Sequence, residues 1–266
     1  MTGPAASSAS LPQRIGLLVW GVACYALFFA CFLYAIAFIG DFALVPKTID
    51  SGEPGPLGLA LAVNLGLLSL FAIQHSVMAR PAFKRAWTKI VPEAAERPTY
   101  VLASTLALAL LFACWQPIGS TVWAVTNPAG ALALRALYFV GWILLLYATA
   151  LIDHFDLFGL RQAWLGFRGR PYTHHPFATP GLYAHVRHPL YVSWAIIFWS
   201  TPVMSVGHLV FAAVATAYMV VAVFIEEHDL VAHFGDAYRR YQDSTPKYLP
   251  RFGRRRAARV RPVHAS

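Results

Sequence analysis

Long apolar segments recur along this chain, and they constrain its fold more than any other feature of the sequence. A helix needs about 20 mostly apolar residues to cross the hydrocarbon core of a bilayer. Only 12% of the residues are charged, 58% are hydrophobic, and the mean hydropathy is +0.54. We therefore predict an all-α, polytopic membrane protein. Its six expected transmembrane helices are residues 15–39, 57–78, 99–115, 135–152, 191–205 and 208–225.

The last two expected helices should form a helical hairpin with its turn at Gly207, although the first of them is short for a membrane span. After the hairpin, apolar residues recur at helical spacing over residues 226–241, which predicts an amphipathic tail helix. We expect four regions in chain order. They are a flexible leader (1–13), four transmembrane helices (14–152), a catalytic and cofactor-binding region (153–250) and a basic C-terminal tail (251–266).

The net charge of +9 is concentrated in basic blocks between the apolar runs. Lys and Arg are typical of the cytoplasmic loops of membrane proteins. Six helices would place the blocks at residues 80–97, 161–187 and 251–261 on one side, together with both termini. We therefore expect both termini in the cytoplasm, no nucleic-acid partner, and contact of the basic tail with the lipid bilayer.

Polar side chains in or beside the expected helices are the candidates for chemistry, because such groups are costly in a membrane. Asn64 and His75 lie on one face of the second helix, and Asp153 and His154 follow the fourth. Singly, each fits a structural interpretation: a histidine bonded to a neighbouring helix, or polar residues at a helix end. Together with the histidines and carboxylates near the hairpin, they favour a polar active-site cavity.

Metal binding is not expected, although the chain contains ten histidines. The sequence has no HExxH and no CxxC motif, and it also lacks the glycine-rich signatures of nucleotide-binding loops. Cys24, Cys31 and Cys114 all lie in apolar runs, where a cysteine usually packs as a small hydrophobic residue.

Four motifs occupy the C-terminal third of the chain: GLY and RHPLY within residues 181–191, EExxL at 226–230, and FGxxYxxY at 234–241. In combination they resemble the integral-membrane methyltransferases, a superfamily that includes isoprenylcysteine carboxyl methyltransferases and phospholipid methyltransferases. This resemblance implies S-adenosylmethionine as the cofactor.

Three further motifs extend the resemblance over most of the chain: QHSVMARP at 74–81, ERPTY at 96–100 and DHFDLFGLRQ at 153–162. They are similar to motifs of the bacterial methanethiol S-methyltransferases. The resemblance implies methyl transfer to a small thiol, most simply methanethiol to give dimethyl sulfide, by a protein of the bacterial inner membrane.

The superfamily resemblance also implies which residues contact the cofactor. They are His175, Tyr183, Arg187, His188, Pro189, Tyr191, Glu226 and Glu227. In the prenylcysteine enzymes an arginine four residues before the position of Glu226 binds the carboxylate of the substrate. Here that position is Ala222, which carries no charge, so an acceptor with a carboxylate is disfavoured.

On the acceptor side, the nucleophile of such a reaction is a thiolate, and a thiol with a pKa near 8.5 or above is only a few per cent ionised at neutral pH. A base, or a field that stabilises the thiolate, would help. His75, Asp153 and His154 are the catalytic candidates, and the sequence does not rank them. Asn64 and Gln162 are the candidates for substrate binding.

Other functions remain open from the sequence. The same architecture could methylate an isoprenylcysteine, a phospholipid or another lipid, which would need an opening between helices for a long apolar acceptor. A small membrane transporter is an alternative of a different class, although matching halves with Gly- or Pro-broken helices are not apparent. A sensor that binds the cofactor without catalysis is a third.

Overall fold

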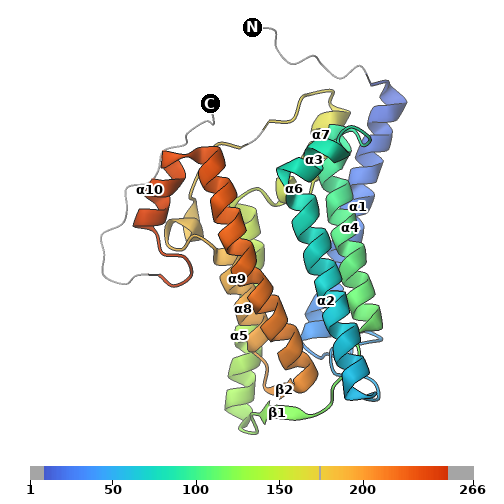
Figure 1. The fold of residues 1–266 in the computed structure, drawn as a ribbon, viewed down its shortest axis with the longest axis vertical. Coiled ribbons are helices and arrows are strands. Elements are labelled where there is room, and N and C mark those ends of the chain that lie inside the picture. Colours follow the sequence, from blue (N-terminus) through green and yellow to red (C-terminus); the bar gives the residue numbers. More distant parts are fainter. Residues whose placement is uncertain (1–8, 174, 251–266) are drawn as a thin grey trace. The chain divides into compact units, whose positions relative to one another are not determined.

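The computed structural model describes residues 9–173 and 175–250, and almost all of its secondary structure is helical (Figure 1). The predicted leader lies mostly outside these residues, and the predicted basic tail lies entirely outside them. The elements in chain order are α1 (Leu11–Ile39), α2 (Leu57–Ala79), α3 (Pro81–Trp87), α4 (Glu93–Cys114), β1 (Thr121–Ala124), α5 (Pro128–Leu151), α6 (His154–Leu157), α7 (Leu160–Phe167), the 3₁₀ turn η1 (Gly181–Ala184), α8 (Pro189–Trp199), β2 (Val203–Ser205), α9 (Val206–Phe234) and α10 (Asp236–Ser244).

Among the described residues, five helices are long and apolar enough to cross a membrane: α1, α2, α4, α5 and α9. They confirm the prediction of a helical, polytopic membrane protein. The expected fifth span corresponds to α8, which has only 11 residues. At 1.5 Å per residue α8 is about 16 Å long, roughly half the thickness of the hydrocarbon core. The count of six spans therefore stays a prediction.

The connection before the last long helix differs from the predicted turn at Gly207. Gly207 lies inside the first turn of α9, and the chain turns earlier, over residues 200–205. Part of this connection is β2, which pairs with β1 in a two-stranded sheet. Strands of three and four residues are too short to show an alternating pattern, so the sequence gives no sign of this sheet.

The tail also differs from the predicted single helix over residues 226–241. Helix α9 continues without a break to Phe234, so Glu226 and Glu227 lie inside it rather than at the start of a new helix. The break comes at Gly235, whose φ of +55° is a conformation that glycine adopts readily. The short amphipathic helix is α10, which begins after this glycine.

The chain divides into two compact units, which are described separately. Unit 1 contains the chain up to Val122 together with Asp153–Thr173 and Ser205–Phe211. Unit 2 contains Trp123–Ile152, His174–Met204 and the chain from Ala212 onward.

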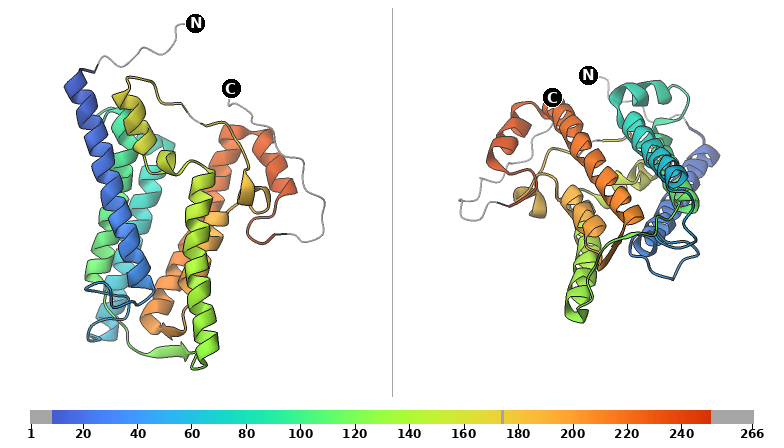
Figure 2. Two further views of the ribbon diagram at one scale, coloured as in Figure 1. Left: turned by 180° about the vertical axis from the view of Figure 1, so that it is seen from behind. Right: turned by 60° about the horizontal axis from the view of Figure 1, so that its bottom comes forward.

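In unit 1, the long helices α1, α2 and α4 lie side by side, and α4 contacts both of the others (Figures 1 and 2). The short helix α7 packs against α1 and α4 at one end of this bundle. Aromatic packing fills the other end, where the rings of Phe38 and Phe112 lie 4.6 Å apart. The indole of Trp115 is fully buried there, and its N–H donates to the carbonyl oxygen of Ile49.

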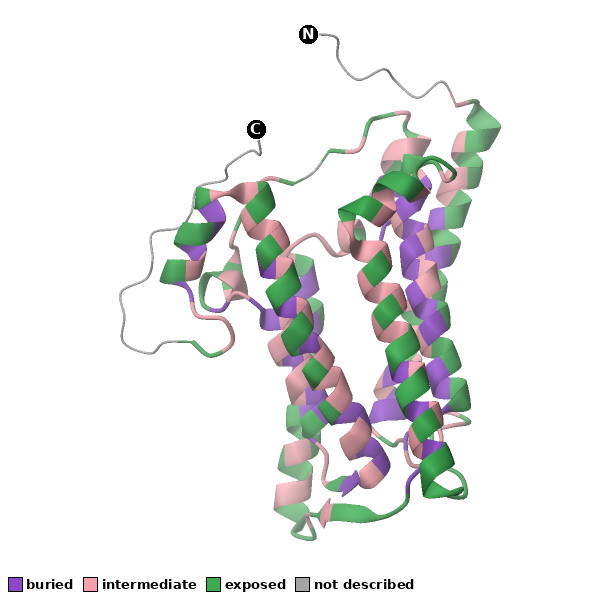
Figure 3. Cartoon of the chain, in the orientation of Figure 1, coloured by how far each residue is buried: buried purple, intermediate pink, exposed green. Residues whose placement is uncertain are grey.

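In unit 2, α5 packs closely against α8. Gly141 makes this approach possible, because a Cβ at this position would lie 2.8 Å from Cγ1 of Ile197 and 3.2 Å from its backbone nitrogen. Small residues allow membrane helices to pack at short distances in this way. A second cluster holds α10: Phe177 packs against Ala237, Tyr238 and Tyr241, all four of them buried. Figure 3 shows that α10 buries one face and exposes the other.

We predict that Gly141→Ala destabilises the packing of α5 against α8. Overpacking a tight contact typically costs about 1–3 kcal/mol, so the midpoint of thermal unfolding in detergent should fall. Gly58→Ala is the matched control, since a Cβ at this position in α2 meets nothing within 4 Å. A Gly141→Ala protein as stable as the wild type would contradict the close approach of the two helices.

Candidate active site

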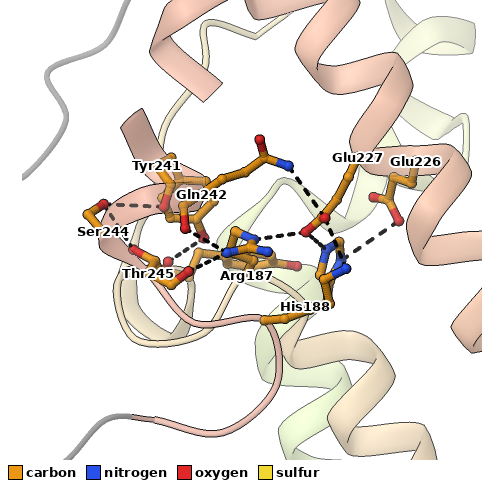
Figure 4. A network of polar contacts seen from close by, with 10 residues as sticks. Arg187, His188, Glu226, Glu227, Tyr241, Gln242, Ser244 and Thr245 are labelled. Carbon is orange, nitrogen blue, oxygen red and sulfur yellow. Dashed lines mark hydrogen bonds and ion pairs between the residues drawn. The ribbon is translucent and has the colours of Figure 1, made fainter. Parts of the chain in front are cut away.

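A buried carboxylate organises the polar contacts of unit 2 (Figure 4). Glu227 is only 7% exposed. Its Oε1 accepts from Nε of Arg187 at 2.8 Å and lies 2.9 Å from Nε2 of His188. Its Oε2 lies 3.1 Å from Nζ of Lys247 and 3.4 Å from the side-chain amide of Gln242. An ionised carboxylate is stable inside a protein only with such partners, and here both of its oxygens are occupied.

Arg187 joins this carboxylate to the end of α10. Its Nη1 donates to the carbonyl oxygens of Gln242 and Thr245, at the C-terminal end of that helix. The last carbonyl groups of a helix have no partners within the helix and carry partial negative charge, so a guanidinium is well placed there. Arg187 therefore fixes α10 relative to Glu227.

The neighbouring carboxylate, Glu226, is more exposed than Glu227 and has fewer hydrogen-bond partners in the described part of the chain. Its side chain is 45% exposed, and its Oε2 accepts from the hydroxyl of Tyr191 at 3.0 Å. The same oxygen lies 3.9 Å from Nδ1 of His188. Among the described residues, no hydrogen bond to the other oxygen of Glu226 is present, so this oxygen can accept one from a ligand.

Tyr183 supplies a second polar atom that can meet a ligand. Its hydroxyl is buried and has no hydrogen-bond partner among the described residues. Burial, followed by the nearby charge of Glu226, raises the pKa of Tyr183 well above its ordinary value. The group therefore keeps its proton and remains a donor. A buried donor without an acceptor is costly, which indicates a site that a polar ligand completes.

Pro189 and His175 are two other residues that were predicted to contact the cofactor. Pro189 is buried at the first position of α8, where its missing N–H costs nothing, so it fixes the start of that helix directly after His188. His175 is exposed, and it lies two residues before Phe177, which packs against α10.

In unit 1, His75 belongs to α2, and its side chain contacts α4. The hydroxyl of Tyr100 is 2.9 Å from its Nε2 and 3.0 Å from its Nδ1, and the hydroxyl of Ser104 is 3.2 Å from Nδ1. Phe71 stacks on its ring. These contacts match the structural interpretation of a histidine bonded to a neighbouring helix, and they leave the catalytic interpretation a prediction.

Asp153 and His154 lie at the single turn of α6. Asp153 has a φ of +70°, and its carboxylate caps this turn by accepting the N–H of Asp156 at 3.1 Å. Nε2 of His154 lies 2.9 Å from the hydroxyl of Tyr25. Burial lowers the pKa of His154 below 6.5, and the carboxylate of Asp153 opposes this shift. The imidazole is therefore neutral at pH 7.

Sequence reasoning missed a set of contacts that holds this turn in place. Asp156 accepts from Nη1 of Arg161 at 3.1 Å and from the hydroxyl of Tyr172 at 3.0 Å. Burial, followed by the charge of Asp156, raises the pKa of Tyr172 to about 12, so the phenol stays a donor. Arg161 also binds Thr173 through its carbonyl oxygen and hydroxyl. The acidic and basic residues of the DHFDLFGLRQ motif were the available signal.

The two predicted substrate-binding amides bind backbone groups of unit 1. Asn64 is fully buried, and its amide exchanges two hydrogen bonds of 2.8 Å with the backbone of Gln116. Oε1 of Gln162 accepts the N–H of Arg97 at 3.1 Å. These contacts favour structural roles, and a contact of either residue with a substrate stays a prediction.

The predicted cofactor residues thus all belong to unit 2, where Arg187, His188, Tyr191, Glu226 and Glu227 form one connected network. The predicted acceptor residues belong to unit 1 and have separate partners. Together, a helical membrane protein and a network built from the RHPLY and EE motifs define the class of integral-membrane methyltransferases.

Comparison with known proteins agrees with this class. Residues 85–245 match the family described as "protein of unknown function (DUF1295)". The methanethiol S-methyltransferase of Crocosphaera subtropica is 48% identical over 93% of this chain and 97% of its own length. Methanethiol S-methyltransferase 2 of Bradyrhizobium diazoefficiens is 51% identical, over 91% and 93% of the two chains. The methanethiol S-methyltransferase of Mycobacterium tuberculosis is 48% identical, over 90% and 97%.

The chain therefore belongs to the DUF1295 family and to the family of the methanethiol S-methyltransferases, which confirms the resemblance drawn from the motifs. No solved structure matches this chain.

Proposed function

We propose that this protein transfers the methyl group of S-adenosylmethionine to methanethiol and releases dimethyl sulfide and S-adenosylhomocysteine. The thiolate sulfur forms a bond to the methyl carbon while the bond from that carbon to the sulfonium breaks, and the electron pair stays on the cofactor sulfur. The thiol proton goes to a base or to water. The relatives named above support the acceptor. The observation that carries the cofactor assignment is the open oxygen of Glu226 together with the unpartnered hydroxyl of Tyr183.

The cofactor side of the reaction is assigned to unit 2. When bound, the cofactor supplies an activated methyl group. Glu226 can accept hydrogen bonds from an ammonium or from ribose hydroxyls, and Tyr183 can donate one. The aromatic faces of Tyr183 and Tyr191 suit a cationic sulfonium. Glu227 has another role in this assignment, because its oxygens are occupied by protein groups.

The acceptor side is assigned to His75, Asp153 and His154. Transfer from a sulfonium to a thiolate cancels two opposite charges, so a site with little water favours it. His154 is neutral at pH 7 and can accept a hydrogen bond from a thiol. Asp153 adds a negative charge beside it, which favours the protonated imidazole during proton transfer. Ala222, one turn before Glu226 on α9, offers no charge to an acceptor carboxylate, which also supports a small neutral thiol.

A first test is the affinity for S-adenosylhomocysteine, measured by calorimetry on purified protein in detergent. We expect Glu226→Gln to weaken binding roughly 10- to 100-fold, because it removes an acceptor for charge-assisted hydrogen bonds. Asp236→Asn is the control, since this exposed residue of α10 loses the same charge without touching the network. Wild-type affinity in both Glu226→Gln and Tyr183→Phe would contradict the cofactor assignment.

A second test is the rate of dimethyl sulfide formation from methanethiol in His75→Ala, His154→Ala and Asp153→Asn. Loss of general-base assistance typically costs about 100- to 10,000-fold. A higher pH should partly restore the rate, because the solution then supplies more thiolate. The affinity for S-adenosylhomocysteine should change little. His228→Ala is the control, since its side chain is 84% exposed. Wild-type rates in all three variants would remove these residues from the mechanism.

We further propose that the protein lies in the bacterial inner membrane with both termini in the cytoplasm. Within unit 1, the C-terminal end of α2, the N-terminal end of α4 and helix α7 share one end of the bundle (Figure 1). This end carries all the Lys and Arg residues of the described part of the unit except Lys47, which lies in the loop between α1 and α2 together with Asp41, Asp50 and Glu53. Such an asymmetry supports a cytoplasmic location for the basic end.

Reporter fusions test this topology. A periplasm-active reporter should work after Gly55, in the loop between α1 and α2, and should fail after Lys89, in the basic loop between α2 and α4. A cytoplasm-active reporter should show the opposite pattern and serves as the control for expression. Activity of one reporter at both positions would contradict the orientation.

A further inference from the structure

The segment that follows α10 is bound to the segment that enters α8. We name residues 245–248 the strap. The backbone N–H of Arg187 donates to the carbonyl oxygen of Pro246 at 2.9 Å, and the N–H of His188 donates to that of Lys247 at 3.2 Å. Two consecutive donors thus meet two consecutive acceptors. The strap therefore lies alongside Arg187 and His188, the residues whose side chains bind Glu227.

The side chain of Lys247, in the strap, reaches α9. Nζ of Lys247 lies 3.1 Å from Oε2 of Glu227 and 4.3 Å from the centre of the Phe224 ring, one turn earlier on the same helix. The side chain of Lys247 is 24% exposed, so it is partly shielded from water. Ion pairs and cation–π contacts are stronger at shielded positions than at exposed ones. Lys247 therefore anchors the strap to α9.

Lys247 also completes the set of donors around Glu227. Arg187 and His188 both bind Oε1, whereas Oε2 is bound, within the described part of the chain, by Lys247 and the amide of Gln242. The amide contact is long, at 3.4 Å. Without the ammonium, Oε2 would be held only by the long amide contact, so the carboxylate that binds His188 and Arg187 through Oε1 would be less firmly placed.

We infer that Lys247 is a positioning residue for the cofactor site: it fixes the Glu227 carboxylate and the strap, and through them the orientation of Arg187 and His188. The inference rests on the proposed function and deepens it. Lys247 acts on binding through these residues without touching the cofactor itself. Its loss should therefore raise KM for S-adenosylmethionine more than it lowers kcat.

The test compares Lys247→Ala and Lys247→Gln with the wild type in two measurements. Calorimetry gives the affinity for S-adenosylhomocysteine, and hydrogen exchange without ligand reports the protection of the Arg187 and His188 amides. Loss of a hydrogen bond to a charged group typically costs about tenfold or more in an equilibrium constant, and we expect about tenfold here because the pair is partly exposed. Exchange at both amides should become faster.

Two further variants separate positioning from a general effect of charge. Lys247→Arg should restore most of the affinity, since a guanidinium can reach the same carboxylate. Arg240→Ala removes one positive charge from the exposed face of α10 and should behave as the wild type. A loss of affinity in Arg240→Ala equal to that in Lys247→Ala would overturn the inference.

The remaining outcomes separate this inference from the proposed function. Faster exchange with unchanged affinity would make the Lys247 contact purely structural and overturn the inference, while leaving cofactor binding intact. Unchanged exchange and affinity would overturn it as well. A wild-type protein that does not bind S-adenosylhomocysteine would instead contradict the proposed function, and the inference would fail with it.

Discussion

Glu227 places a carboxylate in a helix that is apolar enough to cross a membrane. The structure around it in unit 2 supplies the hydrogen-bond donors and positive charges that such a carboxylate requires. An unpaired carboxylate at such a position would be strongly unfavourable. Arg187, His188 and Lys247 meet this need, and they come from two segments about 60 residues apart in the chain. Because the same arginine also binds the last carbonyl groups of α10, the compensation of one charge fixes the tail helix, the strap and the start of α8 together.

Helix geometry explains why two adjacent glutamates have different roles. Consecutive residues on an α-helix point about 100° apart, so Glu227 can face the protein while Glu226 faces outward. Both oxygens of the first are bound by protein donors, whereas one oxygen of the second has no hydrogen bond within the described part of the chain. The motif match predicts that both contact the cofactor, which stays a prediction, but it cannot distinguish the surroundings of two neighbouring carboxylates. That distinction depends on where the charged groups of Arg187 and Lys247 lie, and their positions are determined by tertiary packing rather than by a local sequence pattern.

The long helices were predictable because the apolar runs have the length that a bilayer requires. Their ends were less predictable. Helix α4 starts at Glu93, before the predicted position, and it contains Pro98 in its second turn, where a proline usually marks a helix boundary. The tail helix was predicted to begin at Glu226. No helix-breaking residue lies between Ile225 and Phe234, however, so α9 continues until Gly235, where the chain changes direction. The polar residues themselves could also be identified from the sequence. Their partners could not, because Tyr100, which contacts His75, and Tyr25, which contacts His154, lie on other helices and leave no local signal.

The contacts of unit 1 show how a membrane protein can fix polar groups without a charged core. Tyr25 belongs to α1 and Tyr100 to α4, and each places a hydroxyl against a histidine of another element. In an apolar surrounding such a hydrogen bond orients the imidazole, because no water competes for it. A neutral imidazole that is held in one orientation can direct the lone pair of its acceptor nitrogen at one position. For His154, the Asp153 carboxylate adds a charge that favours the protonated imidazole, as the proposed role of a base requires. The capping role of Asp153 and its electrostatic role are therefore compatible, because one oxygen can hold the turn while the charge acts on the neighbouring ring.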